Sequence, residues 1–359
     1  MHGRRHGPST LPLAAVSTFL LCISSVARAA PQPDAPADQS TRAPYHVEGK
    51  VTEPRVFAEG VVSTVDDEIG GTFSADGKEF YFSRLMPYTT LPRLGIMCVS
   101  YYRDGHWSTP EVVPFSGKYL DYPPKFDSSG RRLLFASSRP APDGTRGRIR
   151  IWEVERTASG WGEPHLLPPP INALDGFWNA DPSQSTDGTL YFSSDRGGRG
   201  SIHIYRSRLI NGQYSEPEKL GPEINSEFND YQPWVSPDGT LLIFVSSGEG
   251  VPPYNHRPQD LTTGGKPYLR GDLYISVNRN GRWSPARHLE HGINSFAEEG
   301  FPFLTPDGRY FFFSSERSPF TVPTAKRLSY EELEKQLRSI FNGHGNVFFI
   351  GVEALELQP

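Results

Sequence analysis

One turn motif occurs five times along the chain, and this repetition limits the possible folds more than any other feature of the sequence. Each copy joins a Pro- or Gly-led segment to an aromatic-rich segment that ends in Phe and small polar residues. Glycine supplies the positive φ of a tight turn and aspartate tolerates the neighbouring position, so each copy predicts a β-hairpin. The five turns end at Asp76-Gly77, Ser129-Gly130, Asp187-Gly188, Asp238-Gly239 and Asp307-Gly308. Their spacing of about 51–69 residues fits one four-stranded blade per copy.

A second turn motif, in which Gly is followed by an aromatic residue and then Pro, comes later in the first four units, beginning at Gly105, Gly160, Gly212 and Gly281. The last unit lacks this motif, but a comparable segment from Gly49 to Pro54 precedes the first unit. We therefore expect an N-terminal strand to complete the last blade, which closes the ring and leaves no exposed sheet edge. The predicted fold is all-β: a five-bladed β-propeller of four-stranded antiparallel blades.

Two segments depart from the repeat. Residues 248–270 form a long insertion in the fourth unit. In the fifth unit, Ser329 and Glu332 have the spacing of a capping box, which predicts one short helix near residues 329–342. Because Leu333, Leu337 and Ile340 recur at helical spacing, we expect this helix to pack against the propeller through them.

The N-terminus predicts export. Arg4 and Arg5 precede an apolar run over residues 11–26, and Ala27 and Ala29 are small residues at a suitable cleavage position. We expect a signal peptide at 1–29, a flexible Pro-rich linker at 30–44 and the propeller at 45–359, in the periplasm or secreted. No second apolar run is long enough to span a membrane after cleavage, and we expect a monomer.

The charge balance excludes some classes of function. The chain carries 36 Lys and Arg against 41 Asp and Glu, a net charge of −5, and no clustered basic surface that would indicate a nucleic-acid partner. It contains no P-loop, dinucleotide fingerprint or nucleophile elbow. His288 and His291 form the only close histidine pair. We therefore expect no cofactor and no metal.

The turn motifs resemble those of a known group. The Ser-Pro-Asp-Gly turn at 236–239, Phe-Ser-Ser-Asp-Arg-Gly-Gly at 192–198 and Asp-Leu-Tyr at 272–274 look like the WD-repeat-like propeller repeats of TolB-type periplasmic proteins. The resemblance covers residues 45–359 and implies a propeller. It leaves the function open, because that group includes binding modules, assembly factors, peptidase-associated propellers and a pectin-fragment lyase.

An acid or amide recurs where each innermost strand begins, three residues before the Pro or Gly that leads the turn segment. The column comprises Glu68, Asp121, Asn179, Asp230 and Glu299, with Tyr122, Asp181 and Tyr231 beside it. Carboxylates gathered at a channel mouth could bind a cation, bind sugar hydroxyls or supply an acid/base pair. Alternatively, these side chains cap backbone amides and hold the blades together.

Arginine follows the aromatic strand in four of the five units, at Arg84, Arg139, Arg196 and Arg317. These side chains could pair with acids of neighbouring blades or bind an anionic ligand. Three functions remain open. We favour a binding module, rather than an enzyme, that recognises a protein, peptide or glycan on the loop face at the channel mouth. The alternatives are a glycan-active hydrolase or lyase that uses the carboxylates, and an envelope assembly component that docks through the helix.

Overall fold

The computed structural model describes residues 43–87, 94–145, 148–172, 176–198, 201–247, 262–263, 266–267, 271–319 and 327–357. The chain divides into two units, residues 1–42 and 43–359, and all the described residues belong to the second. The expected signal peptide, nearly all of the expected linker, and the 248–270 insertion apart from two short strands therefore lie outside the described residues.

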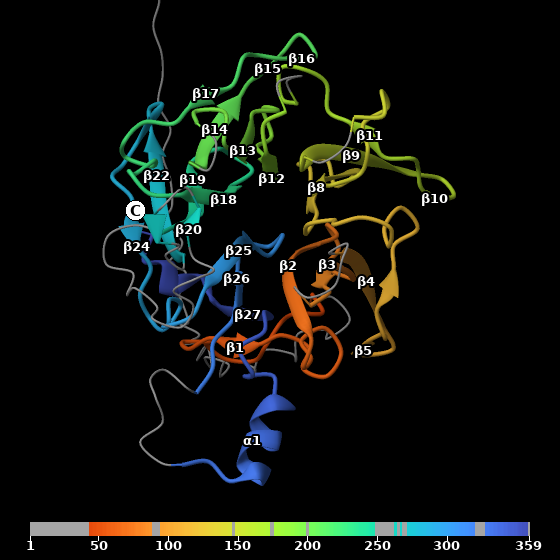
Figure 1. Cartoon of the computed structure of the whole chain (residues 1–359), viewed down its shortest axis with the longest axis vertical. Coiled ribbons are helices and arrows are strands. Elements are labelled where there is room, and N and C mark those ends of the chain that lie inside the picture. Colours follow the sequence, from red (N-terminus) through yellow and green to blue (C-terminus); the bar gives the residue numbers. More distant parts are fainter. Residues whose placement is uncertain are drawn as a thin grey trace, which may run out of the picture. The chain divides into compact units, whose positions relative to one another are not determined.

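Residues 43–359 form a five-bladed β-propeller, as the repeats predict. Figure 1 shows the blades arranged in a ring around a central axis. Each blade is an antiparallel sheet whose strands follow one another outward from the centre. Blade one contains β2 (Asp67–Phe73), β3 (Glu79–Leu85), β4 (Gly95–Arg103), β5 (His106–Trp107) and β6 (Glu111–Val112). Blade two contains β7 (Lys125–Phe126), β8 (Arg132–Ser137), β9 (Arg150–Thr157), β10 (Gly160–Trp161) and β11 (His165–Leu166). Blade three contains β12 (Asn179–Gln184), β13 (Leu190–Ser194), β14 (His203–Ser207) and β17 (Glu218–Lys219).

The last two blades follow the same plan. Blade four contains β18 (Asp230–Val235), β19 (Leu241–Ser246), β22 (Asp272–Arg279), β23 (Arg282–Trp283) and β24 (Arg287–His288). Blade five contains β25 (Glu299–Leu304), β26 (Tyr310–Ser315), β27 (Asn346–Gly351) and β1 (Arg55–Val56). Two small ribbons accompany the blades: β15 (Leu209–Ile210) with β16 (Gln213–Tyr214), and β20 (Thr262–Thr263) with β21 (Lys266–Pro267). A 3₁₀ turn, Val352–Leu355, follows β27.

The Asp-Gly turns join the two inner strands of each blade. In the first blade Asp76 Oδ1 accepts hydrogen bonds from Ser74 Oγ at 2.6 Å and from the Lys78 amide at 3.1 Å, while Gly77 takes φ +72°. Blades three, four and five repeat this arrangement. In blade two the acid and the serine exchange positions, and Ser129 Oγ donates to Asp127 Oδ2 at 2.8 Å. We call the end of the ring that carries these turns the hairpin face, and the end where the inner strands begin the loop face.

The predicted ring closure is confirmed. Strand β1 pairs with β27, with Arg55 opposite Phe349 and Val56 opposite Phe348. Phe57 follows β1 and is buried against rings of blades one and five, with centroids 5.0 Å from Phe80 and 5.2 Å from Phe312. The first strand of the chain therefore fastens the last blade to the first.

The core lies between neighbouring blades. Leu133 and Phe135 of blade two, for example, pack against Tyr81 and Met97 of blade one, and all four are almost fully buried. Similar apolar clusters join the other neighbouring blades. Each blade thus buries both of its faces, which explains why the strands carry so many large apolar residues.

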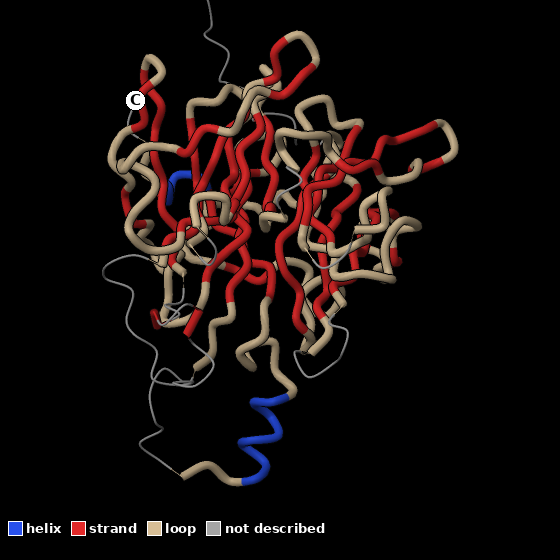
Figure 2. Tube along the Cα trace, turned by 45° about the horizontal axis from the view of Figure 1, so that its top comes forward, coloured by secondary structure: helices blue, strands red, loops and turns tan. Residues whose placement is uncertain are grey.

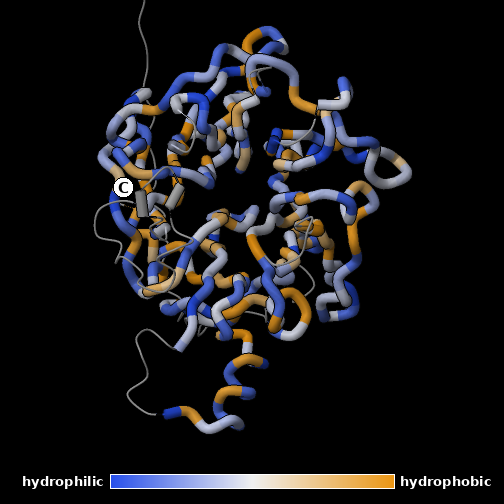
Figure 3. Tube along the Cα trace, viewed as in Figure 1, coloured by the Kyte–Doolittle hydropathy of each residue, from blue (hydrophilic) through white to orange (hydrophobic). Residues whose placement is uncertain are grey.

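The predicted helix is present, but its predicted packing is wrong. Helix α1 (Tyr330–Leu337) has the capping box, with the Glu332 amide donating to Ser329 Oγ at 3.1 Å and the Ser329 amide to Glu332 Oε2 at 2.8 Å. No residue of the helix is buried: Leu333 is 40% exposed and Leu337 60%. The helix lies between β26 and β27 in the sequence and stands away from the blades (Figures 1 and 2), so its apolar stripe is not buried against the sheet. Figure 3 shows hydrophobic and hydrophilic residues alternating along it.

Among the described residues, no helix is both long enough and apolar enough to cross a membrane.

Candidate functional site

The acidic column is fully buried and committed to local hydrogen bonds. Glu68, Asp121, Asp230 and Glu299 are each 0% exposed. Asp121, which precedes β7, accepts from Ser116 Oγ at 2.7 Å, from Ser137 Oγ at 2.5 Å and from Arg139 Nη2 at 3.0 Å. Such a carboxylate joins the start of the innermost strand to the end of the next strand, which is a fastening role.

Three of the four arginines follow one plan. Each donates through Nε to the serine two residues before it. Nη2 contacts the acid or amide of its own blade, by a hydrogen bond from Arg139 and Arg196 and by an ion pair of 3.5 Å from Arg317. Nη2 also donates to a backbone carbonyl in the connection from the previous blade, at 2.8–3.0 Å. The three groups are Arg139 with Ser137, Asp121 and Phe115; Arg196 with Ser194, Asn179 and Ile171; and Arg317 with Ser315, Glu299 and Ile293. The pairing lies within a blade, and not between acids and arginines of neighbouring blades.

The first blade varies this plan. Arg84 Nη2 lies 2.8 Å from Glu68 Oε1, and its Nη1 lies 3.2 Å from the exposed Asp66. Burial raises the pKa of Glu68 and of Glu299, against the lowering effect of their hydroxyl, amide and arginine partners. These perturbed carboxyls have their own local partners, so their pKa shifts do not by themselves mark a reactive site.

Blade four lacks the arginine, because Gly248 stands in its place in the sequence. Asp230 instead accepts from the Ser226 amide at 2.7 Å and from Ser226 Oγ. His203 Nδ1 lies 3.6 Å from Asp230, and His203 Nε2 lies 3.1 Å from Ser201 Oγ. Serine, histidine and aspartate meet here although no sequence motif predicts it, but 3.6 Å is too long for a hydrogen bond and no proton relay is formed.

The two tyrosines beside the column have different surroundings. Tyr231 is buried, and its hydroxyl donates to Glu298 at 3.4 Å. Tyr122 is half-buried, and its amide donates to the Ala136 carbonyl at 2.9 Å. Neither residue borders the cavity described next.

A cavity lies on the hairpin face, opposite the acidic column. It has a volume of about 590 Å³, and all five blades contribute to its wall, which places it on the ring axis. Its wall contains the aromatic residues Phe73, Phe126 and Trp234 and one basic side chain, Lys125. Residues of the hairpin turns form its rim, among them Ala75, Ser128, Ser129, Gly130, Asp238 and Pro306.

Lys125 brings an amine into this cavity without a direct ion pair. Its Nζ donates to the Gly71 carbonyl at 3.0 Å and to the Pro302 carbonyl at 3.2 Å, and lies 4.5 Å from the centre of the Phe303 ring. Within the described chain, no carboxylate oxygen lies within 4.0 Å of it. Burial lowers the pKa of Lys125 to about 7, against the opposing charge of Asp181.

Asp181 belongs to the predicted site, and its negative charge raises the pKa of Lys125. Its Oδ2 accepts from Ser193 Oγ at 2.8 Å. Burial raises its pKa to about 6, although the Ser193 hydrogen bond and the charge of Lys125 lower it. Lys125 lines the cavity and Asp181, which does not, acts on it through its charge; with pKa values near neutrality the two form a candidate site.

A repeated bulge shapes the inner strands at the level of Asp181. The register of β2, β12, β18 and β25 shifts after their first few residues. Inside the bulges φ is +58° at Gly70, +53° at Asp181, +53° at Gln232 and +51° at Phe301. A left-handed non-glycine residue costs about 1 kcal/mol or more, so packing around the channel must impose this conformation three times.

Sequence reasoning missed Lys125, and a signal for it existed. In each unit the residue after the Pro or Gly column faces the same region, and these residues are Thr72, Lys125, Ser183, Trp234 and Phe303. Lys125 is the only charged member. A charged side chain in an innermost strand is costly unless it has a partner or a role.

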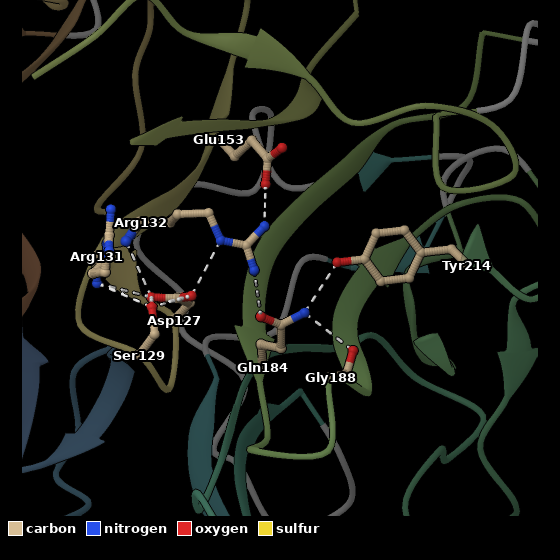
Figure 4. Close-up of polar contacts among 8 residues, drawn as sticks. All are labelled: Asp127, Ser129, Arg131, Arg132, Glu153, Gln184, Gly188 and Tyr214. Carbon is tan, nitrogen blue, oxygen red and sulfur yellow. Dashed lines mark hydrogen bonds and ion pairs between the residues drawn. The ribbon is translucent and has the colours of Figure 1, made fainter. Parts of the chain in front are cut away.

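The polar wall between blades two and three is held by one network (Figure 4). Arg132 donates to Asp127 Oδ2 at 3.1 Å, to Glu153 Oε2 at 2.8 Å and to Gln184 Oε1 at 3.5 Å. Gln184 Nε2 in turn donates to the Tyr214 hydroxyl at 3.0 Å. Asp127 and Gln184 line the cavity, so this network fixes part of its wall.

Among the described residues, no group of three or more His, Cys, Asp and Glu side chains is arranged to hold a metal ion. His288 contacts Asp272 at 2.9 Å and Glu290 at 3.2 Å, and the hydrogen bond to Asp272 is the main cause that raises its pKa. His291 contacts Glu356 instead, so the two histidines do not share a site.

No family model matches the chain, and no curated protein matches it. Among solved structures, a gluconolactonase from Xanthomonas campestris is 17% identical, with a TM-score of 0.41 over 74% of this chain and 80% of that one. An oligogalacturonate lyase from Vibrio parahaemolyticus is 12% identical, with a TM-score of 0.36 over 79% of this chain and 65% of that one. A prolyl endopeptidase is 15% identical, with a TM-score of 0.35 over 68% of this chain. The chain spans 30% of that endopeptidase and less than two thirds of the lyase. At this level the likeness is one of fold and does not extend to ligand or reaction.

Proposed function

We propose that the propeller is a binding module for a glycan, and that the ligand enters the cavity on the hairpin face. The observation that carries this proposal is the composition of the cavity wall, which combines aromatic rings with the amine of Lys125. The sequence suggested the loop face instead. The loop face is less suited to bind a ligand, because its carboxylates are buried and already accept hydrogen bonds from neighbouring side chains.

The cavity has chemistry that suits a sugar. A pyranose has apolar C–H faces that pack against an aromatic ring, and Trp234 and Phe126 supply such rings. Its hydroxyls both donate and accept hydrogen bonds. Lys125 and Ser183 line the cavity and can form hydrogen bonds with these hydroxyls. The volume of about 590 Å³ is in the range of small-ligand sites, which is about 300–1,000 Å³.

The export of the protein belongs to the same proposal. Residues 1–29 have the pattern of a signal peptide, and a periplasmic or secreted propeller would meet glycans of the envelope or the surroundings. Kinship with TolB-type and WD-repeat-like proteins is likewise proposed, because it is supported by the turn motifs alone.

A glycan-active enzyme is the second candidate, and one observation favours it. Lys125 and Asp181 have pKa values shifted toward neutrality from opposite sides, to about 7 and about 6. Groups tuned in this way can exchange protons with a substrate near pH 7. A hydrolase and lyase screen on the purified protein, repeated with Lys125→Met, tests this candidate.

The test of binding begins with a glycan array probed with the purified protein. The best oligosaccharide is then titrated calorimetrically against the wild type and against Trp234→Phe and Trp234→Ala. Loss of the indole should weaken binding by about tenfold or more, because aromatic packing against a ligand contributes on the order of 1 kcal/mol or more. Tyr330→Ala is the matched control, because Tyr330 is 76% exposed on α1 and far along the chain from the cavity. Equal affinity in Trp234→Ala, or an array without any binder, would contradict the proposal.

A further inference from the structure

The amine of Lys125 is placed as a reactive group as well as a hydrogen-bond donor. A neutral amine has two N–H donors and one lone pair, whereas an ammonium has three donors. The carbonyls of Gly71 and Pro302 accept two hydrogen bonds from Nζ. The neutral amine is therefore fully satisfied as a donor, and among the described residues no group donates a hydrogen bond to its lone pair.

The surroundings of the amine favour this neutral form. Lys125 is half-buried among the inner strands and lies beside the Phe303 ring, and burial is the main cause that lowers its pKa to about 7. The ring at 4.5 Å and the charge of Asp181 favour the ammonium, but they do not restore the ordinary pKa. At neutral pH a large fraction of this amine is unprotonated, compared with about one in 2,500 for an exposed lysine.

We infer that Lys125 is a nucleophile that captures aldehydes or ketones in the hairpin-face cavity as a reversible imine. The inference rests on the proposed ligand cavity and names a chemical class for its occupant, a ligand with a free carbonyl group, such as the open-chain form of a reducing sugar. Lys125 borders about 590 Å³ of space, so a small carbonyl compound can reach it.

The step is balanced without an oxidant or a reductant. The Nζ lone pair attacks the carbonyl carbon and forms a C–N bond, while the carbonyl oxygen takes up a proton. The carbinolamine then loses its hydroxyl group as water and nitrogen loses its remaining proton, which leaves a C=N bond. Water reverses the sequence and releases the ligand.

The test uses glycolaldehyde, a small uncharged aldehyde, with sodium cyanoborohydride to trap the imine. The wild-type protein is labelled at pH 7 and at pH 9.5, and peptide mass mapping measures the rate at each lysine. The exposed residues Lys78, Lys118 and Lys219 are internal controls. We expect Lys125 to be labelled at least about tenfold faster than the controls at pH 7, with a smaller ratio at pH 9.5, where the controls also lose protons.

Labelling of Lys125 at the rate of Lys219 or slower at pH 7 would overturn the inference. This comparison is made within one folded protein, so it does not depend on a variant that folds. Lys125→Met then checks the assignment, and its mapped peptide should carry no label at residue 125. The two proposals fail separately: glycan binding without preferential labelling leaves the binding module standing, and preferential labelling without a glycan ligand leaves the reactive amine standing.

Discussion

Lys125 and Asp181 carry opposite charges from neighbouring blades into one channel, and each perturbs the pKa of the other without a direct ion pair. Each is held by other groups, Lys125 by two carbonyls and Asp181 by the Ser193 hydroxyl. The space between two such groups suits a ligand atom that accepts from one and donates to the other.

The first prediction concerns Lys125 and pH. The pKa of Lys125 falls from 10.5 in the unfolded chain to about 7 in the folded protein, so the unfolded chain binds more protons between these values. Stability should therefore rise as the pH rises from about 7 to about 10, because the cost of burying the charge disappears. Lys125→Met removes this cost, and its advantage over the wild type in free energy of unfolding should be larger at pH 6.5 than at pH 10. Urea unfolding at both values measures this difference, and Lys78→Met, at an exposed position, should show no such dependence.

The second prediction concerns Asp181 and has the opposite sign. Its pKa rises from 3.8 to about 6 on folding, so the folded protein binds more protons in this window and stability should fall as the pH rises through it. Asp181→Asn keeps the shape without the charge. The variant should gain stability relative to the wild type between pH 4 and pH 7, as measured by melting temperature. A difference that is constant over this range would mean that the carboxylate is well solvated.

The third prediction tests the fastening role of the acidic column. Asp121→Ala should destabilise the protein by about 3 kcal/mol, because it leaves the charge of the buried Arg139 guanidinium without its carboxylate partner. Asp121→Asn should cost about 1 kcal/mol, because Asn179 holds Arg196 and Ser194 with an amide at the same position of blade three. Urea unfolding compares both with Glu111→Gln on an exposed strand. If all three variants were equally stable, the column would have no fastening role.

The fourth prediction tests ring closure. Phe57 is 5% exposed and packs between blades one and five, so Phe57→Ala should cost about 3–5 kcal/mol. Phe296→Ala is the matched control, because Phe296 is 56% exposed and should change stability by about 0.5 kcal/mol or less. Thermal unfolding of both variants measures the difference. A stable Phe57→Ala protein would show that β1 is dispensable for closure.

The fifth prediction reverses an expectation drawn from the sequence. Leu337→Asp would be strongly destabilising if α1 packed on the propeller, but Leu337 is 60% exposed. We expect a change of about 0.5 kcal/mol or less in the free energy of unfolding. A loss near 2 kcal/mol would mean that the apolar stripe of α1 is covered in solution.

The fold was largely predictable because its information is local and repeated. Five turns, four of them Asp-Gly and one Ser-Gly, set the number of blades, and the missing last turn motif predicted the β1–β27 pair. The capping box at Ser329 located α1. Helical spacing shows which side chains share a face, however, and not whether anything lies opposite that face. The packing of Leu333 and Leu337 could not be derived from it.

The candidate site was only partly predictable. The sequence showed that an acid and an arginine recur in most units. It did not show their hydrogen-bond partners, because some of these lie in the connection between blades, as the Phe115 carbonyl does for Arg139. The bulges of the inner strands place Asp181, Gln232 and Phe301 in the left-handed region. None of these residue types prefers that region strongly enough to be recognised there, because tertiary packing imposes the conformation. Lys125 becomes conspicuous only when the five inner strands are compared position by position.

The pairing of β1 with β27 also brings the first and last strands of the propeller together in one blade. The Gly351 amide donates to the Val51 carbonyl at 2.8 Å, so the two ends of the folded region are neighbours in one sheet. A short linker could join them, and the chain could be opened instead at the exposed connection that carries α1. In such a circular permutant every strand would keep its neighbours, and the last blade would be continuous with the first. Strand β27 would then be synthesised first and β26 last, while blades one to four would keep their order along the chain.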